Sequence, residues 1–186
     1  MTDFSEFYPF IMPDMPGCLD VAVDAELRKV AHRFCNDTWA YQTTVTESVT
    51  KGDETVTPTL PENTSLVGVA KAENQDGDAY YDLETDGNDV LLGGTADSDF
   101  TLTLTLAIKP TMGAADVPDL LYDEHMETIV AGVKAGLFLS PKKSWTSPEL
   151  AVYWKSEYLS GAGSAKRRAF YAGMPTERRA QHNKWI

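Results

Sequence analysis

The chain has 186 residues, of which 42% are apolar and 24% charged, as is typical of a globular protein that buries a substantial core. No apolar run reaches the roughly 20 residues that a membrane span needs, and we expect no signal peptide, because the N-terminal sequence lacks a basic start and an apolar stretch. The formal net charge is −12, but residues 161–186 carry 6 basic side chains and 1 acidic one. An acidic body repels nucleic acid and disfavours sequence-specific DNA binding, whereas the basic end remains available for an acidic protein surface.

The N-terminal region is rich in proline and in large apolar side chains. Three prolines and several aromatic residues lie too close together in residues 4–17 for a regular helix, so we predict an extended arm over residues 1–19. From Asp20 to Thr38 apolar residues recur at helical spacing, which predicts the first helix. Cys35 falls on the apolar face of this helix, and we expect a buried thiol there rather than a disulfide with Cys18.

Residues 40–110 have the composition of a β domain, with abundant threonine, valine, aspartate and glycine. The clearest pattern is the strict alternation in residues 99–109, which places large apolar side chains on one face of a sheet. Short strands separated by Asp-Gly and proline turns predict an antiparallel β-sandwich or small barrel. The predicted strands cover residues 42–49, 54–57, 65–72, 78–84, 89–92 and 99–108.

Helical periodicity resumes between residues 118 and 140, and again from residue 148 to about residue 171. In the first of these helices Gly132 and Gly136 lie one turn apart, which predicts close packing against another helix. The predicted fold class is therefore α+β, a helical bundle with an inserted β-sandwich or small barrel. The predicted parts are the N-terminal arm (1–19), the helical bundle (20–39 and 111–172), the inserted β domain (40–110) and a basic C-terminal docking tail (173–186).

Motifs for catalysis or metal binding are weak in this sequence. Residues 85–94 resemble one copy of a calcium-binding nonapeptide repeat, but a single copy lacks the neighbouring turn that completes each ion site, so a tight Asp-Gly hairpin turn is the favoured interpretation. Carboxylate pairs such as Asp82 and Glu84 have a spacing that glycosidases use, but so does any solvated strand face. The sequence contains no phosphate-binding loop, nucleophile elbow or zinc-binding helix motif. We therefore predict no enzymatic activity and no metal or other cofactor.

The C-terminal stretch from residue 165 to residue 186 mixes basic with aromatic side chains. These residue types anchor protein interfaces, and the aromatic ones are unfavourable to leave in water. A frayed, solvated tail is the alternative. We favour docking onto a partner protein through Lys166, Arg167, Arg168, Phe170, Tyr171, Arg178, Arg179, Lys184, Trp185 and Ile186.

The layout of the chain resembles the head-to-tail adaptor proteins of tailed bacteriophages, also called connector or tail tubular proteins. The resemblance lies in the helix that ends with the sequence RFCNDTW at residues 33–39, in the β segment that follows, and in residues 129–154. In this last stretch a helix rich in small residues ends in a Pro-Trp turn and a new helix begins. The resemblance covers most of the chain by order of elements.

The resemblance implies a structural role in the virion neck, for a protein made in the host cytoplasm. It implies a homo-oligomeric ring, commonly of twelve copies, that binds the portal protein through its C-terminal segment and receives the tail tube or nozzle protein on its other face. DNA would pass through such a ring without sequence-specific binding. The alternative is a calcium- or carbohydrate-binding β module on a helical stalk, with its ligand at residues 74–94.

Overall fold

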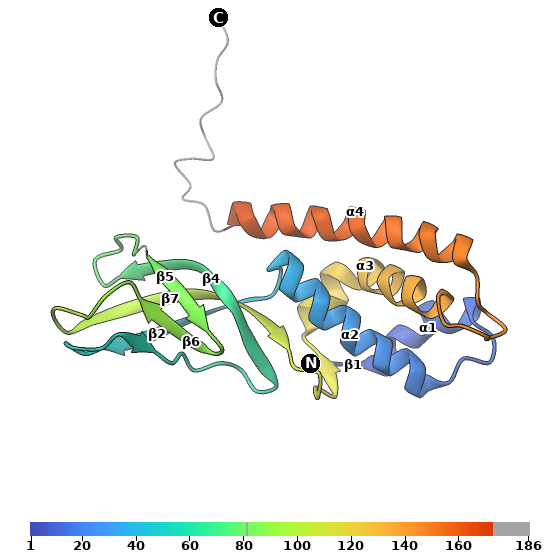
Figure 1. Ribbon diagram of the computed structural model, residues 1–186, viewed down its shortest axis with the longest axis horizontal. Helices are drawn as coiled ribbons and strands as arrows, with labels where there is room; N and C mark the ends of the chain where they lie inside the picture. Colours follow the sequence, from blue (N-terminus) through green and yellow to red (C-terminus); the bar gives the residue numbers. More distant parts are fainter. Residues whose placement is uncertain (81, 173–186) are drawn as a thin grey trace, which may run out of the picture.

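The computed structural model describes residues 1–80 and 82–172 and shows a mixed α+β protein (Figure 1). The α+β class predicted from the sequence is confirmed. Within the described residues the strands form three antiparallel sheets, none of which closes into a barrel. The helices are α1 (Tyr8–Ile11), α2 (Asp20–Thr38), α3 (Asp119–Phe138) and α4 (Pro148–Ala172), and the strands are β1 (Thr2–Asp3), β2 (Gln42–Val49), β3 (Thr55–Val56), β4 (Thr64–Asn74), β5 (Leu83–Asp86), β6 (Asp89–Leu92), β7 (Phe100–Pro110) and β8 (Asp116–Val117).

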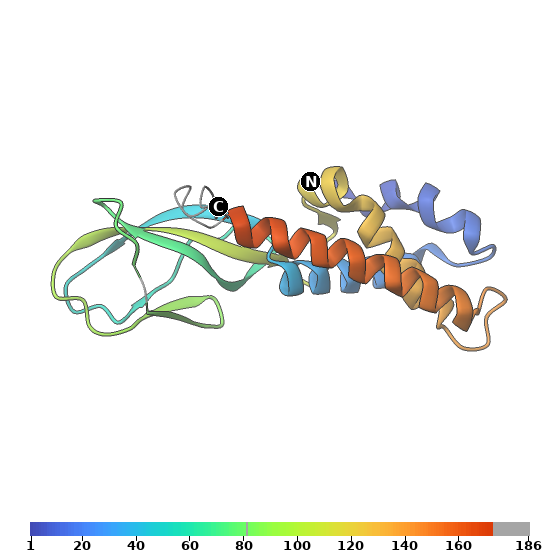
Figure 2. The same cartoon turned by 90° about the horizontal axis from the view of Figure 1, so that it is seen from above.

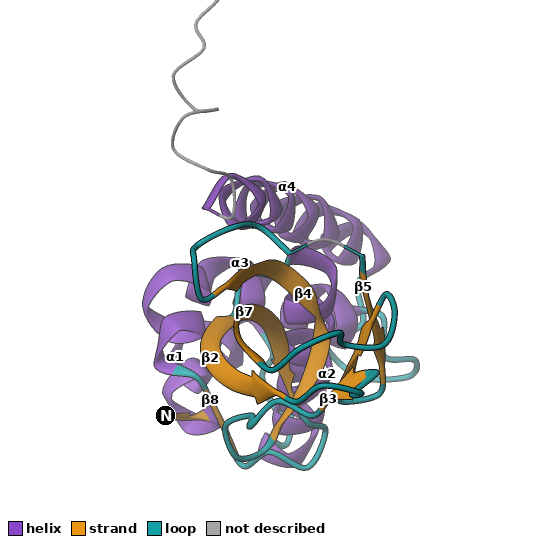
Figure 3. Ribbon diagram, turned by 90° about the vertical axis from the view of Figure 1, so that its left-hand side faces the viewer, coloured by secondary structure: helices purple, strands orange, loops and turns teal. Residues whose placement is uncertain are grey.

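The helices gather at one end of the molecule and most of the strands at the other (Figure 1). Two sheets, with strand orders β2-β7-β4 and β3-β6-β5, form the β end, while β1 pairs with β8 beside the helices. In the view along the long axis, α4 lies at the top, α1 at the left and α2 at the lower right (Figure 3). Strands β2 to β8 lie between α2 and α3 in the chain. The two helices can therefore be in contact only because the β segment begins and ends near the same place.

Helix α3 is covered on every side in its C-terminal half, where residues 129–135 are all buried. A helix that is buried all round needs neighbours on each face. Helix α2, helix α4 and the N-terminal segment supply them, and the three helices share one hydrophobic core. The largest fully buried side chains of this core are Phe7, Ile11, Met15, Val23, Leu27, Phe34, Leu121 and Ile129.

Glycines allow α2 and α4 to approach α3 closely. A methyl group placed on Gly132 would lie 2.7 Å from Val30 of α2 and 2.8 Å from the ring of Tyr158 of α4. A methyl group on Gly161 of α4 would collide with the side chain of Thr128 of α3. The close helix packing predicted from the glycine spacing is confirmed at Gly132, where two helices meet the third at one point.

The prediction of an extended N-terminal arm is wrong. Residues Phe4–Phe7 and Met12–Asp14 form 3₁₀ turns on either side of α1, and the apolar side chains of this segment belong to the helical core. Proline does not prevent this arrangement, because Pro9 and Pro13 lie in the first turn of their short helices, where no backbone N–H needs a partner within the helix.

Lys134 joins three elements inside the helical region. The residue is only 7% exposed, yet its ammonium group lies 2.5 Å from a carboxylate oxygen of Asp14 and 4.4 Å from the centre of the Trp154 ring. A buried cation is tolerated only when it is paired, and here the carboxylate and the aromatic face both satisfy it. Lys134 on α3 therefore ties the N-terminal segment to α4.

The alternating apolar residues of β7 lie on one buried face of the sheet, as predicted from the sequence. The alternating residues Leu102, Leu104, Leu106 and Ile108 are buried in a second core, together with Val90 and Leu92 of β6. The opposite face of the sheet carries threonines, whose hydroxyl oxygens approach across the strands to 3.5 Å, as in the pair Thr44 and Thr105. One apolar face and one hydroxyl-bearing face explain the sequence alternation.

We predict that Gly132→Ala lowers the free energy of unfolding. Overpacking of a tight core costs about 1–3 kcal/mol, which exceeds the gain of up to about 1 kcal/mol from replacing glycine within a helix. Gly163→Ala is the matched control, because the nearest atom to its added methyl group would be an Arg167 nitrogen at 4.0 Å. This control should be neutral or raise the stability by roughly 0.5–1 kcal/mol. Urea unfolding followed by circular dichroism measures both, and equal effects would contradict the packing argument.

Candidate functional site

The predicted docking residues that the structure describes lie at the C-terminal end of α4. Lys166, Arg167, Arg168, Phe170 and Tyr171 are all exposed there. This end of α4 reaches the place where the helices meet the sheets (Figure 1). The remaining predicted docking residues, Arg178, Arg179, Lys184, Trp185 and Ile186, lie outside the described residues.

One flank of the helix end forms a groove together with the start of the β segment. Lys166 and Phe170, one turn apart on α4, line this groove of about 470 Å³ opposite Trp39 and Gln42. Phe170 is 63% exposed and Trp39 is 37% exposed. Two accessible aromatic rings beside an ammonium group are well suited to hold an apolar or acidic side chain of a protein partner. The sequence alone does not indicate that Trp39 belongs to this groove, because only the fold brings it beside Phe170.

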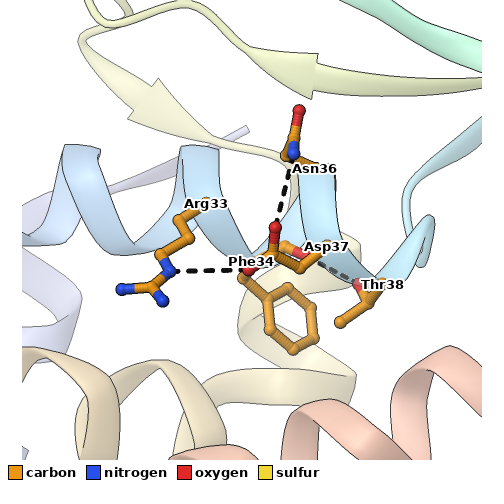
Figure 4. A network of polar contacts seen from close by, with 5 residues as sticks. All are labelled: Arg33, Phe34, Asn36, Asp37 and Thr38. Atoms are coloured by element: carbon orange, nitrogen blue, oxygen red, sulfur yellow. Dashed lines mark hydrogen bonds and ion pairs between the residues drawn. The ribbon is translucent and has the colours of Figure 1, made fainter.

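Trp39 directly follows α2. The polar contacts of the last turn of α2 are shown in Figure 4. The Thr38 hydroxyl donates to the Phe34 carbonyl at 2.7 Å, and Arg33 donates to Asp37 at 3.4 Å one helical turn apart. Trp39 then adopts a left-handed backbone conformation with φ 58°, which ends the helix. Its indole lies directly over Gly68 of β4, where a methyl group would come within 2.8 Å of the ring.

The opposite flank of the helix end carries Arg168. Its guanidinium lies 3.9 Å from a carboxylate oxygen of Glu124 on α3, and both residues border a small hollow of about 170 Å³. His125 forms another wall of this hollow, is 5% exposed and packs against the Phe34 ring at 4.9 Å. Burial lowers the pKa of His125, the nearby Arg168 charge lowers it further, and Glu124 acts in the opposite direction.

The remaining cation of the helix end faces away from both hollows. Arg167 donates to the Ser164 hydroxyl at 3.1 Å. The rings of Phe170 and Tyr171 meet edge to face at 5.8 Å. The cationic and aromatic groups therefore surround the helix end instead of forming a single patch, and this arrangement suits contact with a partner surface on more than one side.

The calcium hypothesis for residues 74–94 has little support in the geometry. The side-chain oxygen of Asn74 accepts from the backbone N–H groups of Asp76 and Asp78, and that of Asn88 accepts from the N–H of Leu66. Gly87 begins the turn between β5 and β6 with φ 62°, so the hairpin turn favoured from the sequence is confirmed. The described part of the chain contains no group of three or more His, Cys, Asp or Glu side chains placed to hold a metal ion.

Two further observations concern the described residues as a whole. Cys18 and Cys35 are both buried and free, and the predicted burial of Cys35 is confirmed. Burial raises the pKa of both thiols. Among the helices that the structure describes, none combines the length and the apolar character needed to cross a lipid bilayer.

Comparisons with known proteins do not identify a relative. No protein-family model matches the chain, and no curated protein sequence matches it. The resemblance to head-to-tail adaptors therefore remains a prediction from the sequence.

We predict that the stability of the protein decreases as the pH falls below about 6.5, the ordinary pKa of histidine. The pKa of His125 is lower in the folded state, so below that pH the unfolded chain binds more protons and is favoured. In His125→Gln this contribution disappears, and the free energy of unfolding should depend less on pH between about pH 5 and 7. Denaturant unfolding across this range tests the prediction, and parallel pH profiles for the two proteins would contradict it.

Proposed function

We propose that this protein is a structural protein of a bacteriophage virion, a ring-forming head-to-tail adaptor that joins the portal to the tail in the neck. The proposal rests on the sequence resemblance and, above all, on the exposed cationic and aromatic end of α4. A helix end that presents Lys166 and Phe170 on one side and Arg168 on the other is suited to insert between other subunits. Its role is mechanical, with no catalysis and no cofactor.

The proposed architecture is a helical bundle of residues 20–39 and 111–172 that carries residues 40–110 as an inserted β-sandwich. Support comes from the two hydrophobic cores, one shared by the helices and one shared by the sheets β2-β7-β4 and β3-β6-β5. Residues 173–186 form the docking tail, which continues the basic end of α4. In the ring, twelve copies pack around the DNA channel.

The charge of the chain suits this role. With 27 acidic and 10 basic side chains in residues 1–160, the body of the protein repels the phosphate backbone, so DNA slides past without being bound. The tail tube or nozzle protein binds on the side away from the portal. This distribution of charge favours the adaptor over a nucleic-acid-binding protein.

Deletion of residues 174–186 should abolish binding to portal rings while leaving the melting temperature unchanged. The deletion removes five predicted docking residues, Arg178, Arg179, Lys184, Trp185 and Ile186, and none of the described residues of the helical core. Electron microscopy and mass photometry of the purified protein mixed with portal rings provide the measurement. Binding of the truncated protein to portal rings with the affinity of the full chain would contradict the tail-docking proposal.

Calcium should leave the melting temperature of the protein unchanged. A ligand that binds only the folded state must raise the melting temperature, by the equivalent of about 2.7 kcal/mol at 100 times its dissociation constant. Thermal unfolding with calcium and, as a control, with magnesium tests this prediction. A rise that is specific to calcium and is lost in Asp86→Asn and Asp89→Asn variants would favour the calcium-binding module instead.

A further inference from the structure

Helix α4 has two flanks with different chemistry, one on either side of the line along which it packs. Its buried residues, Ala151, Tyr158 and Ala165, are seven residues apart and form a narrow stripe. Seen from above, α2 emerges on one side of α4 and α1 on the other (Figure 2). We call the side next to α2 the basic flank, which is lined by Lys155 and Leu159, and the side next to α1 the acidic flank, which is lined by Glu127, Glu157 and Phe10.

The basic flank is a furrow between α2 and α4 with an apolar floor. Gly136 and other small residues of α3 form the floor of a hollow of about 230 Å³, and Leu159 on its rim is 55% exposed. Lys29 and Arg33 on the α2 side already pair with Glu26 and Asp37. Lys155, by contrast, makes no ion pair with any described residue, so its charge is available to a partner.

The furrow also contains a polar atom that lacks a partner. Tyr158 is 7% exposed and its hydroxyl makes no hydrogen bond within the described residues, although the residue borders the hollow. A buried hydroxyl without a partner is unfavourable. Burial raises the pKa of Tyr158 to about 12, so the hydroxyl stays protonated at neutral pH.

The acidic flank has the complementary character. It contains a hollow of about 530 Å³ bordered by the exposed carboxylates of Glu127 and Glu157, neither of which pairs with a described cation. Phe10 at its rim is 43% exposed. The one lysine that borders this hollow, Lys134, is already held by Asp14 and by the Trp154 ring. The flank therefore combines unpaired negative charge with an accessible aromatic side chain.

We propose that copies of this chain associate head to tail, with the acidic flank of one copy seated in the furrow of the basic flank of the next. Lys155 then meets a carboxylate such as Glu157, while Leu159 and Phe10 lose contact with water. Contact between two identical flanks would bring like charges together, which disfavours a symmetric dimer. When two different surfaces of the same chain bind each other, the contact can repeat from copy to copy. The copies close into a ring when the rotation that relates one copy to the next is a whole fraction of a full turn. This inference rests on the proposed function as a ring-forming protein.

Charge reversal on each flank, alone and combined, tests the inference. Lys155→Glu and Glu157→Lys lie two residues apart on α4 but on opposite flanks, and neither residue makes an ion pair within the described residues. Sedimentation velocity of the full chain at low salt should show self-association that each single substitution weakens by about tenfold or more. The double variant, and an equimolar mixture of the two single variants, should regain association because each restores opposite charges across the contact.

Glu84→Lys is the matched control, since it makes the same charge change on an exposed residue of β5 and should leave association unchanged. Raised salt should weaken the wild-type assembly. A wild-type protein that stays monomeric at every attainable concentration, or a double variant that associates no better than the single ones, would overturn the inference. If the variants self-associate in the predicted pattern but the protein does not bind portal rings, the proposed contact between copies is supported and the adaptor function is rejected.

Discussion

The structure depends on the complete burial of the second half of α3. Residues 129–135 contact protein on all sides, so the helix is stable only where other segments cover each of its faces. Helix α2 covers one face, α4 a second, and the N-terminal turns a third. Because α2 precedes the strands and α3 follows them, the helical core forms only when both ends of the β segment are held at the same place.

The small residues of α3 explain the unusual exposure of α4. Gly132 lets the Tyr158 ring sit between the helices, so α4 is anchored by one narrow stripe of contact. A helix of 25 residues attached along such a stripe keeps both of its flanks open. The same close packing that stabilises the core thus creates the two surfaces that we propose to meet in the assembly, and it carries the cationic helix end toward the sheets.

Local patterns in the sequence were sufficient to predict the long elements. The alternation in β7 and the helical periodicity of α2 each predicted the correct buried face, because the spacing of apolar residues within an element determines which side chains share a face. Helix α3 was predicted as a helix, but its second half is buried on all sides and has no single apolar face. The N-terminal segment was predicted wrongly, because its apolar side chains are buried against α2 and the distant α3, and the local sequence does not reveal these contacts. The groove beside Phe170 was missed for the same reason, since Trp39 lies 131 positions earlier in the chain. The ion pair of Lys134 with Asp14 likewise has no local signature.

The distribution of positive charge limits how copies of this chain can meet. Two molecules that each carry a net charge of −12 repel one another at long range, so a stable contact has to place cations of one copy against carboxylates of the next. Among the described residues outside the strands and their turns, exposed cations concentrate on α4, on the loop that precedes it and on the neighbouring face of α2. The β end offers carboxylates but few cations, and of these Lys71 is already paired with Glu73. Contacts between copies that use electrostatic attraction therefore draw most of their cations from α4 and its immediate neighbours, while the β end offers Lys51, which is exposed in the turn after β2.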